Sequence, residues 1–248
     1  MSTEKTEGLV IRLADFSETS RVVTLFTRDW GKVSALAKGG RRLNSSFEAA
    51  LDLLTACRIV FIRKLSSSLD ILTEAQLISR FRPLGRKLNG YYAGYYVAEL
   101  LSGLTEDYDP HPVLYDEAIK TLAHLSEGID VKLPVLRFEL ITLREIGQLP
   151  AFDVCVVCNR PFQFNGGLAF WGSQRGLVCS KCRKTETIHN RVQSATLAIL
   201  RYLTEESKTI PQNLAVSPQQ FREIRRVVTA AISHSLERRP KMLKFLKF

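Results

Sequence analysis

Four cysteines form two closely spaced pairs in the second half of the chain. Two residues separate Cys155 from Cys158 and Cys179 from Cys182, and twenty residues separate the two pairs. Two such pairs across a loop of this length provide four thiolates that can surround Zn²⁺ as a tetrahedron. Because four thiolates leave no coordination position for water or substrate, we expect one structural zinc ion per chain, bound by Cys155, Cys158, Cys179 and Cys182.

The expected location of the protein favours metal binding over disulfides for these pairs. The first eight residues are polar and lack the apolar core of a signal peptide, and no later segment contains about eighteen consecutive apolar residues. We therefore expect a protein that stays inside the cell and spans no membrane, where paired cysteines remain reduced. The fifth cysteine, Cys57, lies alone in an apolar run and is expected in the core.

The chain is strongly basic, and its positive charge lies toward the two ends. It has 35 Lys and Arg residues against 25 Asp and Glu residues, a formal net charge of +10. Residues 1–82 carry a net +4 and residues 183–248 a net +8, whereas residues 83–182 carry a net −2. Such a surplus points to a polyanionic partner, and nucleic acid is the most common polyanion inside a cell.

The basic residues of the N-terminal segment are candidate phosphate ligands. The run Lys38-Gly39-Gly40-Arg41-Arg42 is the sharpest candidate, because glycines let backbone N–H groups approach a phosphate while flanking cations neutralise it. An ordinary solvated loop is the alternative. Phe16, Phe26 and Trp30 could stack on bases, although core packing explains Phe26 and Trp30 better.

The pattern from Glu7 to Arg82 is that of β-strands. Alternating apolar residues, separated by turn residues, predict five antiparallel strands and a short helical or irregular piece around residues 46–51. The predicted strands lie near residues 9–14, 21–27, 32–38, 54–64 and 69–81. Five short strands in this length favour a small closed barrel of the OB type, with an SH3-like barrel as the nearest rival.

After Pro83 the apolar period becomes helical, so the predicted fold class is α+β. The first helix is expected to end near residue 107, and four more are expected near residues 112–127, 133–147, 192–203 and 219–236. The predicted organisation is an OB domain at 1–82 that binds DNA and a helical domain at 83–248, with an inserted zinc-binding element at 150–185.

No residue pattern in the chain suggests catalysis. The four histidines are scattered, and the chain has no Walker loop, no H-E-x-x-H and no G-x-S-x-G. The acidic turn of Glu106, Asp107 and Asp109 is better explained by helix capping. We therefore do not expect an enzyme.

Several segments, in this order, resemble the RecO family of recombination mediator proteins. The match covers the whole chain and depends on the order and spacing of the segments, not on any single motif. Those that resemble the barrel are Thr6–Arg12, Ser17–Thr27, Gly31–Arg42 and Leu72–Ala75, and those that resemble the helical part are Arg137–Leu140 and Arg239–Lys241.

The resemblance implies an OB domain, a helical domain with a four-cysteine zinc element, and no catalytic turnover. Members of the family bind single- and double-stranded DNA, anneal complementary strands, and act with RecR and the single-strand binding protein to load RecA onto gaps. It also implies a place in the bacterial cytoplasm, at the nucleoid. By position, the DNA-binding role of the barrel would fall on Arg12, Arg21, Lys32, Lys38, Arg41 and Arg42.

Two other classes of protein share some of these features. A zinc-ribbon transcription factor or RNA-binding protein would have the same charge and cysteines, and a preference for RNA over DNA would identify it. A nuclease would need clustered carboxylates and a divalent metal, which the sequence does not offer.

Overall fold

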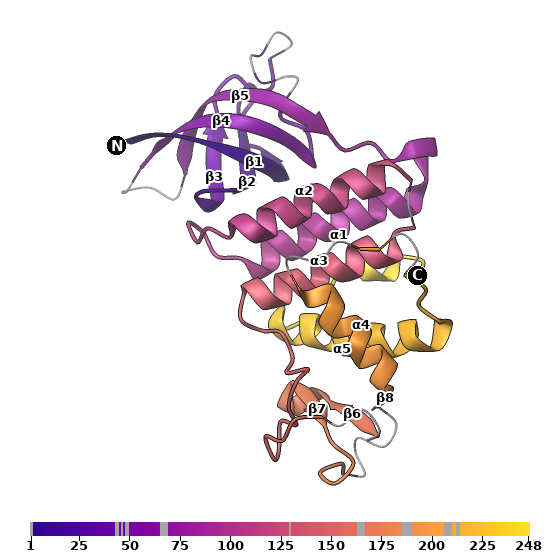
Figure 1. The fold of residues 1–248 in the computed structure, drawn as a ribbon. Coiled ribbons are helices and arrows are strands. Elements are labelled where there is room, and N and C mark those ends of the chain that lie inside the picture. The colour runs from indigo at the N-terminus through magenta and orange to yellow at the C-terminus, as the bar shows by residue number, and fades with distance from the viewer. Residues whose placement is uncertain are drawn as a thin grey trace. The chain divides into compact units, whose positions relative to one another are not determined.

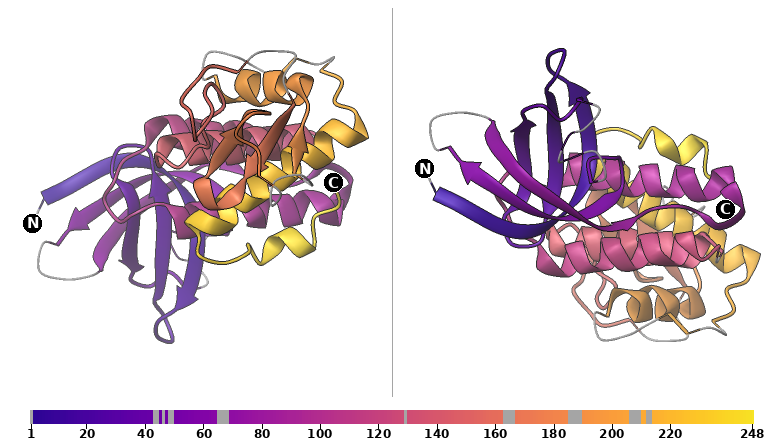
Figure 2. Two further views of the ribbon diagram at one scale, coloured as in Figure 1. Left: turned by 90° about the horizontal axis from the view of Figure 1, so that it is seen from below. Right: turned by 90° about the horizontal axis from the view of Figure 1, so that it is seen from above.

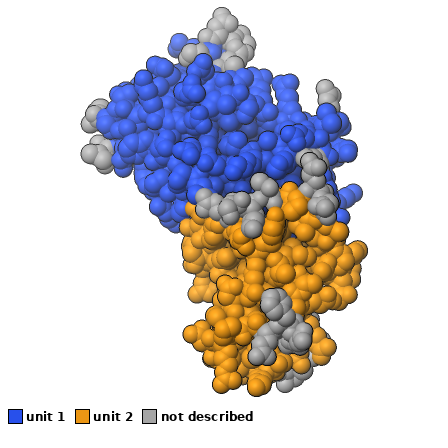
Figure 3. All heavy atoms as spheres, in the orientation of Figure 1, with its two compact units in different colours: residues 1–138, 240–248 blue, residues 139–239 orange. Residues whose placement is uncertain are grey.

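The chain folds into two compact units, each with its own hydrophobic core. The computed structural model describes residues 2–42, 45, 47, 50–64, 69–128, 130–162, 167–184, 190–205, 210–211 and 214–248. The first unit comprises residues 1–138 and 240–248, and the second comprises residues 139–239 (Figure 3).

The first unit contains a closed five-stranded barrel (Figure 1). Its strands are β1 (Ser2–Asp15), β2 (Arg21–Thr27), β3 (Gly31–Ala37), β4 (Thr55–Arg63) and β5 (Asp70–Arg80). They follow the order β1-β2-β3-β5-β4, and the long β1 closes the barrel by pairing with β4 through its first half and with β2 through its second half. The predicted OB-type barrel is confirmed, but the strands are not all antiparallel as predicted, because β3 and β5 pair in parallel where they close the barrel.

The interior of the barrel is filled by alternate residues of the strands and by the segment between β3 and β4. Val10, Leu25 and Phe61 are fully buried in one cluster, together with Phe47 and Leu51 from that segment. The predicted helical or irregular piece at 46–51 therefore contributes to the core. Of that piece, residues 46, 48 and 49 lie outside the described part of the chain.

A β-bulge in β1 decides which side chains of this strand face outward. Val10 pairs with Leu25 and Arg12 pairs with Thr24, so Ile11 is the extra residue. Strict alternation from the inward-facing Val10 would direct Arg12 inward as well. The bulge reverses the phase, so that Leu13 packs on the barrel core and Arg12 is exposed.

Helices cover one part of the outer surface of the barrel, as the views of Figure 2 show. These are α1 (Leu88–Leu104) and α2 (Pro112–Ser126), which follow the short η1 (Leu84–Arg86). The fully buried Phe26 on the outer side of β2 lies against Tyr115 of α2, with 6.4 Å between ring centroids.

The connection from α1 to α2 lies against the turn between β2 and β3. Gly31 has a φ of +66°, and a Cβ atom there would lie 2.2 Å from the carbonyl oxygen of Asp109, so only glycine fits. The hydroxyl of Tyr108 donates to the buried carboxylate of Asp70 over 2.6 Å. Burial and this carboxylate raise the pKa of Tyr108. The connection is thus fixed to the barrel.

The C-terminal residues return to the first unit. Glu99 of α1 accepts hydrogen bonds from the backbone N–H groups of Lys241 and Met242, at 2.7 and 2.8 Å, where η4 (Met242–Lys244) begins. Asn89 bonds both backbone groups of Lys247, at 2.9 and 3.1 Å. These contacts attach the tail to α1.

The second unit combines helices with a small sheet. The helices α4 (Ser194–Thr204) and α5 (Pro218–Ser235) join the end of α3 (Lys132–Glu145), which begins in the first unit. The sheet has the order β7-β6-β8, and η2 (Gly172–Gln174) connects two of its strands. Its strands are β6 (Leu168–Trp171), β7 (Gly176–Val178) and β8 (Arg191–Val192).

All five predicted helices are present, with ends close to the predicted ones. The change from strands to helices occurs near the predicted residue 82, but α1 and α2 belong to the same compact unit as the barrel. Among the described residues, no helix combines the length and the apolar character that crossing a bilayer requires.

Candidate metal centre and nucleic-acid interface

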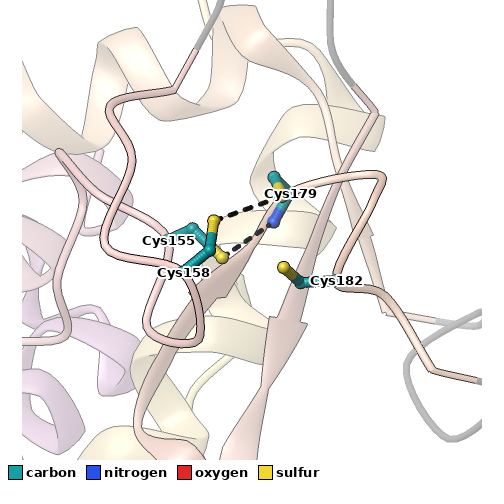
Figure 4. A group of neighbouring side chains, drawn as sticks. All are labelled: Cys155, Cys158, Cys179 and Cys182. Atoms are coloured by element: carbon teal, nitrogen blue, oxygen red, sulfur yellow. Dashed lines mark hydrogen bonds between the residues drawn. The ribbon is translucent and has the colours of Figure 1, made fainter.

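The four cysteines converge on one point of the second unit (Figure 4). Their Sγ atoms all lie within 4.8 Å of one another, and those of Cys158 and Cys179 are 3.9 Å apart. A disulfide would require about 2.05 Å between the sulfurs. Zinc–sulfur bonds of about 2.3 Å in a tetrahedron place the sulfurs about 3.8 Å apart, so the donor set and its spacing fit Zn²⁺.

The first cysteine pair is held by a tight backbone turn. The N–H of Cys155 donates to the carbonyl of Arg160 over 2.9 Å, and the N–H of Asn159 donates back to Cys155 over 2.8 Å. Asn159 takes a left-handed φ of +56°, which asparagine tolerates better than most residues. This turn presents both thiols on the same side.

A second backbone turn holds Cys179 and Cys182, and a glycine allows the first turn to pack beside it. The N–H of Cys182 donates to the carbonyl of Cys179 over 3.1 Å, and the N–H of Val156 donates to Leu177 of β7 over 3.0 Å. A Cβ atom on Gly176 would lie 2.1 Å from a methyl group of Val156. Glycine at this position therefore lets the first turn lie against β7.

Hydrogen bonds favour the thiolate form of one of the four cysteines, Cys155. Burial disfavours the charged form of Cys155, but the N–H groups of Cys158, Cys179 and Val157 outweigh burial and lower its pKa to about 6. The N–H of Cys179 lies 3.4 Å from the Cys155 sulfur. By contrast, hydrogen bonds to Cys158 and Cys179 raise the pKa of Cys182 to about 12. A bound dication would compensate half of the charge of the four thiolates and so favour their deprotonated form.

Arginines attach the cysteine element to the helices of the same unit. The guanidinium of Arg201 on α4 donates to the carbonyl of Phe152, at 3.0 and 2.7 Å, and pairs with Asp153 at 3.0 Å. Arg175 donates to the side-chain amide of Gln148 over 2.6 Å. Of the predicted element at 150–185, residues 163–166 and 185 lie outside the described part of the chain.

Five of the six predicted DNA-binding residues lie toward one end of the barrel. There β1 ends, β2 begins and β3 ends, and Arg21 pairs with Ala37, the residue before Lys38. The N–H of Arg41 donates to the carbonyl of Thr19 over 3.0 Å, so loops 16–20 and 38–42 lie side by side. We call this region the barrel-end surface and define it by Arg12, Phe16, Arg21, Lys38, Arg41 and Arg42.

One carboxylate organises part of this surface. Asp15 pairs with Arg21 through one oxygen and with Arg41 through the other, each at 3.5 Å. Arg41 also donates to the carbonyl of Ser17 over 2.8 Å. Gly39, with a φ of +73°, turns the second loop toward the first. Five cations face only Asp15 and Glu18 in these loops, so the surface keeps a net positive charge.

The three aromatic candidates have very different environments. Phe16 is 61% exposed, at the start of the loop that Arg41 holds in place. Phe26 is 0% exposed, and Trp30 packs edge-on against Phe61 and under the guanidinium of Arg63. Only Phe16 among these rings offers a free face for a base.

Lys32 is separated from the other five predicted residues. It lies at the opposite end of β3 from Lys38, and only 16% of its side chain is exposed. Its ammonium group donates to the carbonyls of Thr105 and Ser102, at 2.6 and 3.2 Å, at the C-terminal end of α1. We therefore assign Lys32 to the attachment of α1 and omit it from the barrel-end surface.

Neither the role of Asp15 nor the bulge at Ile11 is predictable from the sequence. An acidic residue among candidate phosphate ligands gives no signal of its own, because its role depends on two arginines that are distant in sequence. The bulge has no signature in a run of apolar residues such as Leu9-Val10-Ile11.

Comparison with known proteins matches both parts of the chain. Residues 1–81 match the family model for the N-terminal part of recombination protein O, and residues 86–244 match that for its C-terminal part. The chain is similar to the DNA repair protein RecO of Rhodopirellula baltica, with 34% identity over 96% of this chain and 97% of the relative. The RecO proteins of Anaeromyxobacter dehalogenans (31% identity; 99% and 96% covered) and Bacillus mycoides (28%; 91% and 89%) are also similar. This chain, with its closed barrel and its four-cysteine cluster, belongs to the RecO family of DNA repair proteins.

Proposed function

We propose that this protein binds single-stranded DNA at the barrel-end surface and anneals complementary strands. One observation carries the proposal: the barrel gathers five cations and one exposed aromatic ring at the loops of one end. Cations along a groove contact phosphates, and an exposed ring stacks on bases without regard to sequence. Double-stranded DNA would be bound through phosphate contacts alone.

Annealing requires no bond to be made or broken in this proposal. Two DNA strands repel each other, and a protein that neutralises phosphates on both strands lowers the free energy of bringing them together. The family supports RecR, the single-strand binding protein and, indirectly, RecA as partners. With them the protein would help to load RecA onto coated gaps, and it would act by binding rather than as an enzyme.

The test replaces exposed cations and keeps those that shape the loops. Arg12, Lys38 and Arg42 have no ion partner among the described residues, whereas Arg21 and Arg41 hold Asp15 and the loop carbonyls. Arg12→Ala, Lys38→Ala and Arg42→Ala together should weaken binding of a labelled oligonucleotide at least tenfold at low salt. If all three contact phosphates, the slope of log K against log salt should fall by about 2, since each contact contributes about 0.7 for single strands.

A second triple variant controls for the loss of charge. Lys5, Arg82 and Lys87 are exposed cations outside the barrel-end surface, and replacing all three by Ala removes the same charge. We expect this variant to bind within about twofold of the unchanged protein, because distant exposed charges are screened. Equal losses in both variants would mean that only net charge matters and would remove the barrel-end surface from the function.

We further propose that the four cysteines bind one structural Zn²⁺. Metal analysis of protein purified under reducing conditions should find one zinc per chain, and Cys155→Ser should lower that content. Loss of a structural zinc removes folding free energy, so chelation should lower the unfolding temperature of the protein. Zinc-free protein with an unchanged unfolding temperature would contradict this assignment.

A further inference from the structure

A pocket of about 400 Å³ lies beside the cysteine cluster, within the second unit. Its wall includes Cys179 together with Arg160, Phe162, Ser180 and Lys181, and Leu168 forms an apolar part of it. A volume of this size lies within the range of small-molecule sites, about 300–1,000 Å³. The pocket combines two cations, a hydroxyl group and an aromatic ring.

The two cations of this pocket differ from other basic residues in and around the cysteine element. Arg201 and Arg175 bond to neighbouring groups of the protein, and the ammonium of Lys184 lies 5.1 Å from the centre of the Trp171 ring. Arg160 and Lys181 are exposed and have no ion pair or hydrogen bond from their side chains within the described part of the chain. They are therefore available to an anion.

A metal at the cysteines would not reverse the positive charge of this region. Among described residues 150–162 and 167–184 there are five cations and one carboxylate, Asp153, a net charge of +4. Zinc with four thiolates contributes −2, which leaves a net +2. The region therefore has more positive charge than is needed to neutralise zinc with its four thiolates.

The apolar lining gives the pocket a second type of contact. Phe162 is half-buried and packs in part on the cluster of Cys155, Ala169 and Val178, which fixes its position. Leu168 is 2% exposed and belongs to β6. A flat ring held by packing beside two free cations is the arrangement that binds a nucleobase and its phosphate.

We propose that this pocket binds one nucleotide of a single DNA strand, with the base on Phe162 and the adjoining phosphate at Arg160 and Lys181. The proposal rests on the proposed function and adds a second contact for DNA, in a different unit from the barrel-end surface. Annealing involves two strands, and a protein with two separate sites can hold both.

The experiment measures binding of an oligothymidylate in the background of the barrel triple variant, Arg12→Ala, Lys38→Ala and Arg42→Ala. Adding Arg160→Ala and Lys181→Ala should weaken the remaining affinity about tenfold and lower the salt slope by about 0.7, which corresponds to the one phosphate that both cations contact. The matched control adds Arg191→Ala and Arg222→Ala, which are exposed cations of the same unit outside the pocket. Losses equal to those of the control would overturn the proposal.

The role of the ring is tested separately from that of the cations. Phe162→Leu should weaken binding of oligothymidylate about fivefold and leave binding of an abasic oligonucleotide of equal length unchanged, because stacking needs a base. Phe162→Met repeats this test with a more adaptable side chain, and zinc content confirms folding of both variants. If the substitution weakens binding of both oligonucleotides equally, or of neither, the pocket does not bind a base. It would then be at most a phosphate site.

A crosslinking measurement on the unsubstituted protein needs no variant. An oligonucleotide with one photoreactive thymidine should crosslink to peptides that contain Phe162 or Lys181, and absence of such crosslinks would contradict the pocket.

The proposed function of the barrel-end surface and the proposed nucleotide pocket can be contradicted independently. Unchanged affinity of the barrel triple variant would remove the barrel-end surface, whereas a pocket variant that matches its control would remove only this inference.

Discussion

Neighbouring groups decide the roles of basic residues that are equivalent by type. Arg41 and Arg42 are adjacent in sequence, yet Arg41 bonds to Ser17 and Asp15 while Arg42 is exposed and has no such partner among the described residues. Lys32 bonds to two carbonyls at the C-terminal end of α1. An arginine that shapes a loop and one that contacts a phosphate must therefore be replaced in separate variants.

Phe16 provides the sharpest test of base stacking on the barrel. Phe16→Ala should reduce affinity for single strands about fivefold or more, because stacking contributes about 1–3 kcal/mol per base. The free energy of unfolding should change little, since the ring is 61% exposed. Phe16→Tyr keeps a ring and should bind like the unchanged protein. If Phe16→Ala binds oligothymidylate normally, this ring is not a stacking surface.

The helix α3 carries two buried ions of opposite charge toward different helices. Arg137 pairs with Glu117 of α2 at 3.1 Å, within the first unit. Glu139 pairs with Arg225 of α5, within the second unit. Burial raises the pKa of Glu117 above its ordinary value, although Arg137 opposes this shift. The effect of removing the Glu117 carboxylate from water on its pKa is thus larger than the opposing effect of the ion pair with Arg137.

Breaking the pair of Arg137 and Glu117 should make stability depend on pH. Arg137→Met leaves a buried carboxylate without this partner and should lower the free energy of unfolding by about 3 kcal/mol. A carboxyl group whose pKa is raised on folding stabilises the fold while protonated, and this contribution is lost as pH rises through the raised pKa. The loss relative to the unchanged protein should therefore be larger at pH 8 than at pH 6, measured by urea unfolding.

The corresponding double variant distinguishes charge from packing. Arg137→Met with Glu117→Gln removes both charges, so the difference between pH 6 and pH 8 should disappear and part of the stability should return. A double variant as unstable and as dependent on pH as Arg137→Met would show that the carboxylate is not the cause.

The molecule as a whole has two units that each contain free cations and an aromatic ring. In the first unit these belong to the barrel-end surface, and in the second they belong to the pocket beside the cysteines. Their separation into two units suits a protein that acts on two strands. The net charge of +10 adds a general attraction for DNA that salt weakens.

Annealing should depend more steeply on salt than binding of one strand does. Bringing two strands together requires phosphates on both to be neutralised, so more counterions are released than in binding one strand. The rate of annealing of complementary oligonucleotides and the affinity for one of them should be measured over the same salt series. Equal slopes would indicate that the protein neutralises only one strand.

The amino-acid sequence by itself determined the four-cysteine cluster and the order of elements. The cysteine pairs are local, since each spans four residues of a tight turn, and such geometry follows from spacing. The strands of the barrel and the five helices followed from apolar periodicity, because a buried face must repeat with the period of its element. Charge and segment order indicated a protein that binds nucleic acid.

Only the tertiary structure decided which residues form each surface. The bulge at Ile11 turns Arg12 outward, Asp15 joins two loops, and Lys32 lies at the far end of β3 from Lys38. It also grouped α1 and α2 with the barrel and placed Arg160 and Lys181 around one pocket. These features depend on contacts between residues distant in sequence, and periodicity carries no information about which distant residues meet.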